Sequence, residues 1–278
     1  MQTVQRHITY HGPITTAIFD WAGTVLDFGC VAPVQAFQQV FEEVGVPISI
    51  AQARAPMGAA KREHIALILK NARVQARWQQ RFGRACTDRD VDALYAQFLR
   101  VDRVHVEKHS ALIPGALETL AALRARQMAI GSTTGYPREV MAYLAPLAAA
   151  QGYRPDYCCT VSDVARGRPW PDMCLMNALK LGVAHVQSCV VVDDSPTGLQ
   201  AGLAAGMWTV GIAATGNEVG LTLDEWALLD DAARQARLIP ARQKLAQSGA
   251  HFVIDSIAQL PAVIDQIDAF LQARRRPV

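Results

Sequence analysis

An aspartate at the end of an apolar segment is the first residue whose position suggests chemistry. Asp20 follows the apolar stretch 16–19 and precedes Trp-Ala-Gly-Thr at 21–24. A carboxylate at the end of a strand, followed by a turn that contains glycine, is exposed and surrounded by backbone N–H groups. These groups can hold phosphoryl oxygens while the carboxylate attacks phosphorus. The same pattern also occurs where an aspartate merely caps a turn, so alone it leaves both interpretations open.

Two further segments offer groups that bind an anion. Three hydroxyl side chains follow the apolar residues 128–131, namely Ser132, Thr133 and Thr134. They can bind phosphate oxygens, or they can cap a helix before Pro137. Arg168 lies in the sequence Arg-Gly-Arg-Pro at 166–169, just before a helical pattern. A guanidinium there can clamp a phosphonate, although loop arginines are also common on surfaces.

A pair of carboxylates supplies the fourth signal. Asp193 and Asp194 directly follow the apolar stretch 189–192. Adjacent carboxylates at the end of a buried strand repel each other, and a cation beside them removes that cost. The pair therefore favours a Mg²⁺ site, unless the loop is open to water and both charges are simply solvated.

The elements that must position these residues follow from the apolar pattern. Short apolar stretches alternate with segments of helical spacing, which predicts a doubly wound α/β fold, Rossmann-like, with a parallel sheet. We expect strands at 16–19, 128–131, 157–161, 189–192 and 208–212, and a weaker one at 251–254. We expect helices at 116–126, 139–149, 173–180 and 198–205. All four candidate segments then fall at the carboxyl edge of the sheet, where ligands bind.

The segment between about residues 28 and 109 contains helical patterns and no strand pattern. A loop of that length has no place in a compact domain. We therefore expect an all-helical cap domain, inserted after the first strand and placed over the edge of the sheet. The expected domains are the first part of the core at 1–28, the cap at 29–108 and the second part of the core at 109–278.

Together these motifs resemble the haloacid dehalogenase superfamily, in which the same four motifs occur in this order. Most of its phosphatases carry a second aspartate two residues after the nucleophile, as acid and base, where this chain has Ala22. In detail the sequence resembles the phosphonoacetaldehyde hydrolase family (phosphonatases), which lacks that aspartate. Its most specific motifs here are Asp-Trp-Ala-Gly-Thr and Met-Gly-x-x-Lys-x-x-His. The matching stretches are 19–24, 29–33, 56–64, 131–136, 167–169 and 205–211.

The resemblance implies hydrolysis of the C–P bond of phosphonoacetaldehyde to acetaldehyde and phosphate. Asp20 would attack phosphorus and form an aspartyl phosphate. Lys61 would form a Schiff base with the substrate aldehyde, and His64 would relay protons. One Mg²⁺ per subunit would be held by Asp20, the backbone carbonyl of Ala22 and Asp194. The residues expected to bind the substrate are Thr134, Ser132, Thr133, Arg168, Met57, Tyr136 and Cys30.

The resemblance also implies a biological role, and the sequence departs from the family at one position. It implies a homodimer that degrades phosphonates such as 2-aminoethylphosphonate. Family members can carry a further aspartate four residues after the position of Asp194, where this chain has Gly198. Asp193 or a water would then support the metal in its place.

The spacing around Lys61 agrees with the imine-forming role that the resemblance implies. Lys61, His64, Ile65 and Ile68 share one helix face, and an apolar face disfavours the ammonium. The pKa of a lysine side chain is normally about 10.4, and the amine must lose its proton before it attacks a carbonyl. A lysine on a helix can instead extend its charge to water. Ala22 favours the imine, because without an acid at that position an ester leaving group is not protonated.

Composition excludes several classes of protein. The 278 residues are 51% hydrophobic and carry a net charge of +2, so no basic excess suggests a nucleic-acid partner. No apolar run approaches the ~18–20 residues that span a bilayer. The six cysteines form no Cys-x-x-Cys pair, and residues 1–13 do not read as a secretory signal. We therefore expect a cytoplasmic protein that acts on a small-molecule phosphonate.

Two alternative functions remain at this stage. The first is an ordinary phosphatase or phosphomutase of the same superfamily, acting on a small phosphate ester, and Ala22 argues against it. The second is a non-catalytic protein on the same fold. The joint presence of Asp20, Lys61 and Asp194 argues against the second.

Overall fold

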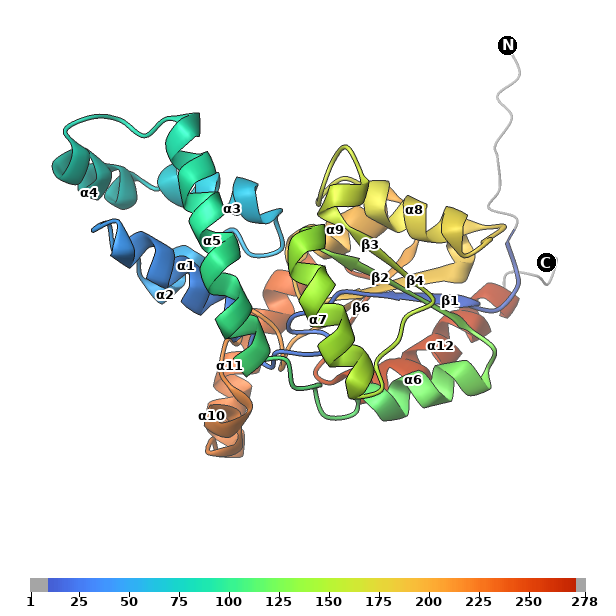
Figure 1. Ribbon diagram of the computed structural model, residues 1–278. Coiled ribbons are helices and arrows are strands. Elements are labelled where there is room, and N and C mark those ends of the chain that lie inside the picture. The colour runs from blue at the N-terminus through green and yellow to red at the C-terminus, as the bar shows by residue number, and fades with distance from the viewer. Residues whose placement is uncertain (1–9, 274–278) are drawn as a thin grey trace, which may run out of the picture.

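The computed structural model describes residues 10–273 and contains a parallel sheet that helices cover on both faces (Figure 1). Within these residues the sheet has six strands in the order β3-β2-β1-β4-β5-β6, all paired in parallel. This confirms the predicted doubly wound α/β fold. The strands are β1 (Thr16–Phe19), β2 (Ala129–Thr134), β3 (Tyr157–Thr160), β4 (Cys189–Asp193), β5 (Trp208–Ile212) and β6 (Phe252–Ile254).

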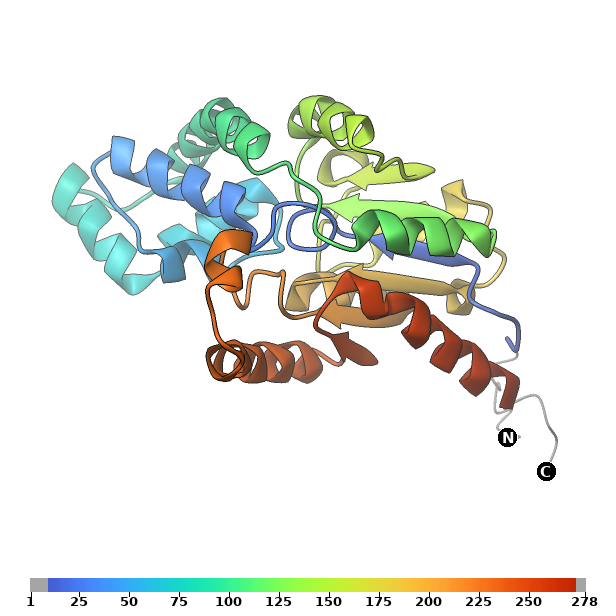
Figure 2. The same ribbon diagram turned by 90° about the horizontal axis from the view of Figure 1, so that it is seen from below.

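Helices pack on both faces because the central strands are apolar on both sides. Ala17 and Phe19 of β1 belong to one apolar layer, and Ile18 belongs to the other. In Figures 1 and 2, α6 and α12 lie on the opposite face from α8 and α9. The first layer contains α6 (Ala116–Ala125), α7 (Arg138–Ala150) and α12 (Leu260–Ala273). The second layer contains α8 (Asp172–Lys180), α9 (Pro196–Ala204) and α11 (Asp231–Gln247).

Five helices follow β1 and form a group beside the carboxyl edge of the sheet (Figure 1). Inside this group α5 packs against α1 and α3. Phe37 on α1 stacks on Phe98 of α5, with ring centroids 4.7 Å apart. The helix α5 also packs on α7 of the sheet layer. The five helices are α1 (Val31–Glu43), α2 (Ile50–Arg54), α3 (Lys61–Leu69), α4 (Ala72–Phe82) and α5 (Asp88–Lys108).

Strand β2 extends three residues beyond the carboxyl end that the sequence predicts, from Gly131 to Thr134. Ser132 pairs with Phe19 of β1 and with Cys158 of β3, and Thr134 pairs with Thr160. The three hydroxyl residues therefore belong to the strand and do not follow it, because β3 pairs with all three of them and β1 with the first. The expectation that they follow the strand was wrong.

The remaining elements are short or lack a clear apolar pattern. They were not expected from the sequence, and neither were α11 and α12. They are α10 (Leu223–Ala227) and the 3₁₀ turns η1 (Val161–Asp163), η2 (Val186–Ser188) and η3 (Ile257–Gln259).

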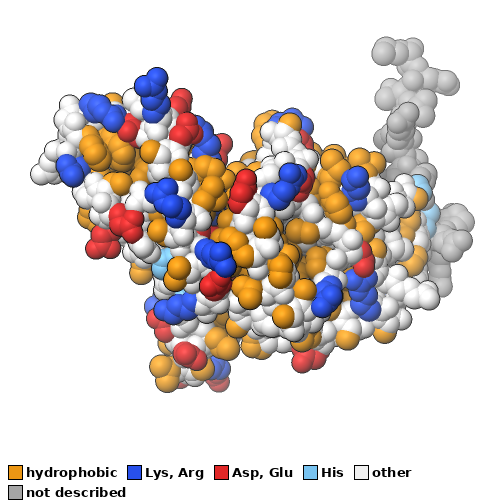
Figure 3. Space-filling view, viewed as in Figure 1, with side chains coloured by type: hydrophobic (Ala, Val, Ile, Leu, Met, Phe, Trp, Pro, Cys, Tyr) orange, Lys and Arg blue, Asp and Glu red, His pale blue; other side chains and the backbone are white. Residues whose placement is uncertain are grey.

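The edge of the sheet beside α1–α5 is where a ligand site is expected. Strands β1 and β4 are neighbours although they are not consecutive, so the strand order reverses between them, and ligands bind at such switch points. On the face seen in Figure 3, acidic and basic side chains are interspersed, and the surface is indented between α1–α5 and the sheet. No helix within residues 10–273 is long and apolar enough to cross a membrane.

Candidate active site

The carboxylate of Asp20 lies where β1 ends, at the switch point of the sheet. The Asp20 N–H donates to Val192 O at 2.9 Å and so extends the ladder between β1 and β4. The chain then turns through Gly23, whose φ of 85° favours glycine. A Cβ at Gly23 would lie 2.4 Å from Asp194 Oδ2. The turn can therefore pass this close to the second carboxylate only with glycine at position 23.

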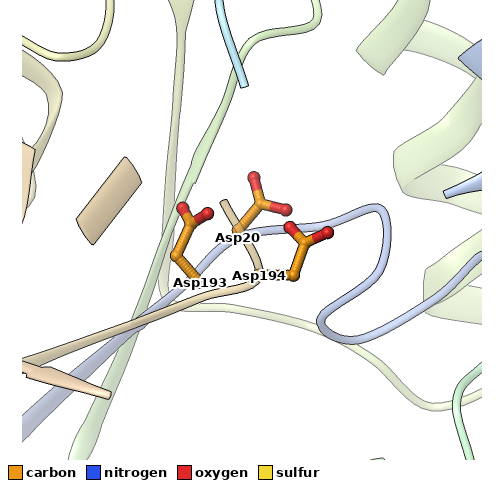
Figure 4. A group of neighbouring side chains, drawn as sticks. All are labelled: Asp20, Asp193 and Asp194. Carbon is orange, nitrogen blue, oxygen red and sulfur yellow. The ribbon is translucent and has the colours of Figure 1, made fainter. Parts of the chain in front are cut away.

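Three buried carboxylates, Asp20, Asp193 and Asp194, form an acidic cluster. Each offers one oxygen, and these oxygens lie within 4.8 Å of one another. Figure 4 shows the carboxylates pointing to the same side of the strand ends. Burial, followed by the charges of Asp20 and Asp193, raises the pKa of Asp194 well above its ordinary value. Burial likewise raises the pKa of Asp193 to about 6. The cluster holds more negative charge than its surroundings balance, and a divalent cation removes that excess.

The residues around this cluster fit a magnesium ion. Ala22 lines the pocket beside Asp20 and Asp194. Its carbonyl oxygen accepts no backbone hydrogen bond from the part of the chain that the structure describes. The N–H of Asn217 donates to Asp194 Oδ2 at 2.7 Å and orients that carboxylate. Mg²⁺ prefers oxygen ligands and binds through one or two carboxylates with water completing its shell.

Asp193 fills the space that a side chain at Gly198 would need. A Cβ at position 198 would lie 1.9 Å from Asp193 Oδ2. Asp193 Oδ1 accepts hydrogen bonds from the N–H and the hydroxyl of Ser195, at 2.9 and 2.7 Å. Its Oδ2 lies 3.2 Å from Arg168 Nη2. Asp193 thus places a carboxylate in the space beside Gly198, where it supports Arg168, and it does not line the pocket.

The guanidinium of Arg168 is buried between the two acidic strand ends. Its Nη2 donates to Asp20 Oδ1 at 2.7 Å, and to the carbonyl and the hydroxyl of Thr133 at 3.1 and 2.7 Å. Every one of these contacts uses Nη2, and no hydrogen bond from Nη1 or Nε to residues 10–273 is found. Arg168 therefore holds the carboxylate of Asp20 and still has donors for an anion in the pocket.

The three hydroxyl residues of β2 lie at different depths. Thr134 lines the pocket, and its Oγ1 accepts the N–H of Tyr136 at 3.0 Å. Thr133 lies behind it and bonds to Arg168. Ser132 is deeper still, and the side-chain amide of Asn177 bonds to its backbone N–H and carbonyl. Of the three, only Thr134 is among the residues that line the pocket.

Lys61 faces the same pocket from the helical group. It is the first residue of α3 and is 6% exposed. Its Nζ lies 4.5 Å from the ring centroid of Tyr136 and 5.8 Å from that of Phe37. Burial lowers the pKa of Lys61, while the charges of Asp102 and Asp20 act in the opposite direction. The positive end of the helix dipole at the first turn also disfavours the ammonium.

His64 shares the buried face of α3 but does not line the pocket. Its Nε2 lies 2.7 Å from Ala53 O, so this nitrogen carries the proton. The ring packs against that of Phe37, with centroids 4.1 Å apart and planes tilted by 33°. Burial, followed by the charge of Lys61, lowers the pKa of His64 to about 3. The imidazole is therefore neutral at physiological pH, and its free Nδ1 can accept a proton only weakly.

The loop before α3 packs against residues that follow β2 and β4, and it lines the pocket. Gly58 has φ 93°, and a Cβ there would lie 2.1 Å from Thr197 Oγ1. A Cβ at Gly135 would lie 3.0 Å from Ala59 O. Arg54 adds a polar anchor, since its guanidinium donates to Gly29 O at 2.8 Å and to Gly220 O at 2.9 Å. Glycines at both contact points let the loop approach the residues after β2 and β4 closely.

Nine residues expected from the sequence line one pocket. The structure brings both expected reactive groups, the metal ligands and most of the substrate contacts to this pocket. The nine expected residues that line the pocket are Asp20, Ala22, Cys30, Met57, Lys61, Thr134, Tyr136, Arg168 and Asp194. His64, Ser132, Thr133 and Asp193 lie behind the lining.

Several residues that support the site were not expected from the sequence. Arg54 on α2 bonds to Asn217, which follows β5, and Asn177 supports β2. Asp102 is buried near Lys61. One signal for it exists, because Asp102 interrupts the apolar face formed by Val91, Leu94, Phe98 and Val106 of α5. A buried aspartate at such a position requires a hydrogen-bond or ion-pair partner.

Comparisons with known proteins agree with this site. The model of the haloacid dehalogenase-like hydrolases matches residues 14–206. The chain is 44% identical over 268 residues to phosphonoacetaldehyde hydrolase from Hahella chejuensis, covering 96% of this chain and 91% of the relative. It is 46% identical over 269 residues to the Vibrio cholerae enzyme of the same name, covering 96% and 99%.

A solved structure extends the agreement to three dimensions. The crystal structure of a phosphonoacetaldehyde hydrolase-like protein from Oleispira antarctica superposes with a TM-score of 0.95 at 41% identity, covering 99% of this chain and all of that one. Similarity of this extent over nearly the whole chain shows the family. The chain belongs to the haloacid dehalogenase-like hydrolases and, within them, to the phosphonoacetaldehyde hydrolase family.

Proposed function

We propose that this protein hydrolyses the C–P bond of phosphonoacetaldehyde and releases acetaldehyde and phosphate. The observation that carries the proposal is the pairing in one pocket of the Asp20 carboxylate with a buried lysine, Lys61, while position 22 is alanine. Full-length relatives named for this activity support the choice of substrate. The protein would thus serve phosphonate degradation, downstream of 2-aminoethylphosphonate.

Lys61 allows the substrate carbon that is bonded to phosphorus to act as a leaving group. The neutral amine adds to the aldehyde carbon, and loss of water gives an iminium one bond from the carbon attached to phosphorus. Burial of Lys61 lowers its pKa and so increases the fraction of neutral amine. When the C–P bond breaks, its electrons form an enamine and neutralise the iminium. Protonation of the enamine and hydrolysis then release acetaldehyde and free Lys61.

Asp20 receives the phosphoryl group. Its carboxylate attacks phosphorus while the C–P bond breaks, which forms an aspartyl phosphate that water then hydrolyses to phosphate. Arg168 holds Asp20 Oδ1 at 2.7 Å and has further donors for the phosphonate oxygens. Thr134 adds a polar group at the end of β2. Cys30, Met57 and Tyr136 would surround the aldehyde end near Lys61, with Ser132 and Thr133 supporting the phosphonate site from behind.

Magnesium would be held by Asp20, the carbonyl of Ala22 and Asp194. When bound, one Mg²⁺ per subunit would offset the negative charge of the phosphonate and of the acidic cluster. Asp193 would support Arg168 from behind. We also propose that His64 stays neutral and serves the proton traffic around Lys61 at most indirectly, because it lies behind the pocket.

The family also supports a homodimer and a cytoplasmic location as parts of this proposal. The six cysteines are all free in the structure, which suits a reducing compartment. The helices at 29–108 would act as a cap over the sheet, closing on the substrate through the loop at Gly58.

A substrate panel tests the proposed reaction. Phosphonoacetaldehyde should yield equal amounts of phosphate and acetaldehyde in the presence of Mg²⁺. Small phosphate esters should be turned over at least about a hundredfold more slowly, since no carboxylate at position 22 can protonate an ester oxygen. Phosphate release by a coupled assay and acetaldehyde reduction by a dehydrogenase measure both products. Faster turnover of an ester would identify an ordinary phosphatase or phosphomutase instead.

The metal site makes a separate prediction. Asp194→Asn removes a charged ligand, so the Mg²⁺ concentration for half-maximal activity should rise about tenfold or more. Asp193→Asn is the matched comparison, because its carboxylate bonds to Ser195 and faces Arg168. It should lower kcat with a smaller change in the Mg²⁺ requirement. A Mg²⁺ titration of phosphate release distinguishes them, and the opposite ranking would make Asp193 the ligand.

A further inference from the structure

A buried carboxylate lies in the helical group, apart from the acidic cluster. Asp102 on α5 is 0% exposed. Its Oδ2 accepts a hydrogen bond of 3.2 Å from the hydroxyl of Tyr143 on α7. Its Oδ1 has no hydrogen-bond partner within residues 10–273. A buried carboxylate with a free oxygen is costly unless a nearby positive charge or a proton compensates it.

The compensating charge is that of Lys61. Helix α5 packs on α3, which begins with Lys61. The two charges interact, since Lys61 favours the ionised form of Asp102 and Asp102 favours the ammonium of Lys61. The Lys61 amine has no hydrogen bond or ion pair with a described residue, and its near contacts are the rings of Tyr136 and Phe37. Oδ1 of Asp102 and the amine of Lys61 thus each lack a hydrogen-bond partner among the described residues, and both lie on the packed helices α5 and α3.

The other carboxylates near Lys61 are already engaged. Asp27 is buried too, but its two oxygens accept the N–H groups of Val31 and Ala32 at 2.9 and 3.0 Å. Asp27 therefore caps the first turn of α1. Asp20 is bonded to Arg168 and is the proposed nucleophile. Among these three, Asp102 is the carboxylate with a fully buried oxygen, Oδ1, that has no hydrogen-bond partner within residues 10–273.

We propose that Asp102 is a positioning residue for Lys61, whose carboxylate charge holds the Lys61 side chain at the pocket and stabilises the iminium. Lys61 loses its ammonium proton to water, and the neutral amine adds to the aldehyde to give a carbinolamine. The carbinolamine hydroxyl takes up a proton from water and leaves as water. The products are an iminium and water, and the Asp102 carboxylate compensates the positive charge of the iminium, so charge and protons balance. This inference rests on the proposed function, whose Lys61 imine it completes.

The pH dependence follows from the surroundings of Asp102. The titratable groups that act on its carboxyl are Lys61 from α3 and Tyr143 from α7, and Tyr136 lies within its field. Helix α1, which also packs on α5, contributes none. Burial raises the pKa of Asp102 to about 7. The ionised form that compensates the charge of Lys61 and of the iminium is thus present above pH 7 and is lost as the pH falls through that value, which gives kcat a low-pH limb.

The test compares Asp102→Asn with Asp92→Asn as the matched control. Asp92 lies on the same helix and also faces α3, where it pairs with Arg62 at 2.7 Å, but its side chain is 61% exposed. The first measurement needs no substrate: the rate at which acetic anhydride acetylates Lys61 is followed by mass spectrometry as the pH is varied. Loss of the Asp102 charge should lower the apparent pKa of Lys61 by about one unit or more. Asp92→Asn should leave that pKa unchanged.

The second measurement is turnover of phosphonoacetaldehyde. Asp102→Asn should lower kcat by at least about tenfold with KM changed less than about twofold, since Arg168 and Thr134 still hold the phosphonate. The low-pH limb near 7 should disappear. An unchanged Lys61 pKa in folded Asp102→Asn protein overturns the inference, and so does a retained limb.

A second variant covers the case in which Asp102→Asn does not fold. Tyr143→Phe keeps the carboxylate and removes the hydrogen bond that lowers its pKa. The low-pH limb of kcat should therefore move to higher pH, and a limb that stays in place contradicts the proposal. Failure of the proposed function looks different: wild-type protein treated with borohydride and phosphonoacetaldehyde would then form no adduct, whatever the pKa of Lys61.

Discussion

Replacing Asp20 with asparagine abolishes turnover of phosphonoacetaldehyde and leaves the protein folded. An amide cannot form an acyl phosphate, so the covalent step has no nucleophile. We expect kcat to fall by about a thousandfold or more, as it does in other enzymes when the catalytic nucleophile is removed. Phosphate release by purified protein at saturating Mg²⁺ measures the loss. Turnover within tenfold of wild type would mean that another group attacks phosphorus.

The control for this variant is its stability. The asparagine side chain of Asp20→Asn carries no charge, so Asp193 and Asp194 lose a repelling neighbour while Arg168 keeps Asp193 at 3.2 Å. We therefore expect the thermal midpoint to change by no more than a few degrees. Asp268→Asn is a matched variant, since this part-buried carboxylate accepts the N–H of Ile14 at 2.7 Å, away from the pocket. It should keep turnover within about twofold of wild type, as expected for a residue without a role in the site.

Topology explains why the strand ends could be predicted from the sequence. Parallel strands end at one edge, so residues that follow different strands meet there although the sequence separates them widely. Asp20 and Asp194 lie at the ends of β1 and β4, which the sequence located from their apolar runs, and the structure places both in one pocket. Lys61 was assigned from the resemblance to the phosphonoacetaldehyde hydrolase family, and the apolar face of its helix agreed with that assignment.

Residues that act through distant partners could not be predicted in this way. Arg54 bonds to Asn217 across 163 positions, and Asp102 bonds to Tyr143 across 41. No local spacing connects such pairs. Helix α11 was missed for a different reason: it has few apolar residues and contains Pro240, so neither periodicity nor propensity indicated a helix.

The depth of a residue behind the pocket is also invisible in the sequence. Ser132, Thr133 and Thr134 are consecutive, yet Thr134 lines the pocket while the other two bond to Asn177 and Arg168. Their strand continues through all three, and the side chains of a strand alternate between its faces. The sequence therefore indicated a polar strand end without indicating which hydroxyl faces the substrate.

Replacing Lys61 with arginine abolishes C–P cleavage while phosphonate binding remains. The guanidinium stays protonated, so it keeps the charge and cannot form an imine. Without the iminium the carbon would have to leave as a carbanion, so we expect kcat to fall by about a thousandfold or more. Binding of a phosphonate that lacks an aldehyde should change little, since Arg168 and Thr134 are intact. Calorimetric titration with methylphosphonate measures that binding.

Chemical trapping shows whether the lysine acts as the imine requires. Borohydride should inactivate the wild-type protein only when phosphonoacetaldehyde is present, and the reduced adduct should map to Lys61 by mass spectrometry. Lys70→Arg is a suitable control, because Lys70 is an exposed lysine that directly follows the same helix. The Lys70→Arg protein should form the same adduct and should turn over like wild type.

A rise in KM with kcat unchanged in Lys61→Arg would mean that the lysine only binds charge. An adduct on another lysine, or full activity of Lys61→Arg, would leave the buried amine without a catalytic role and make the protein an atypical phosphatase.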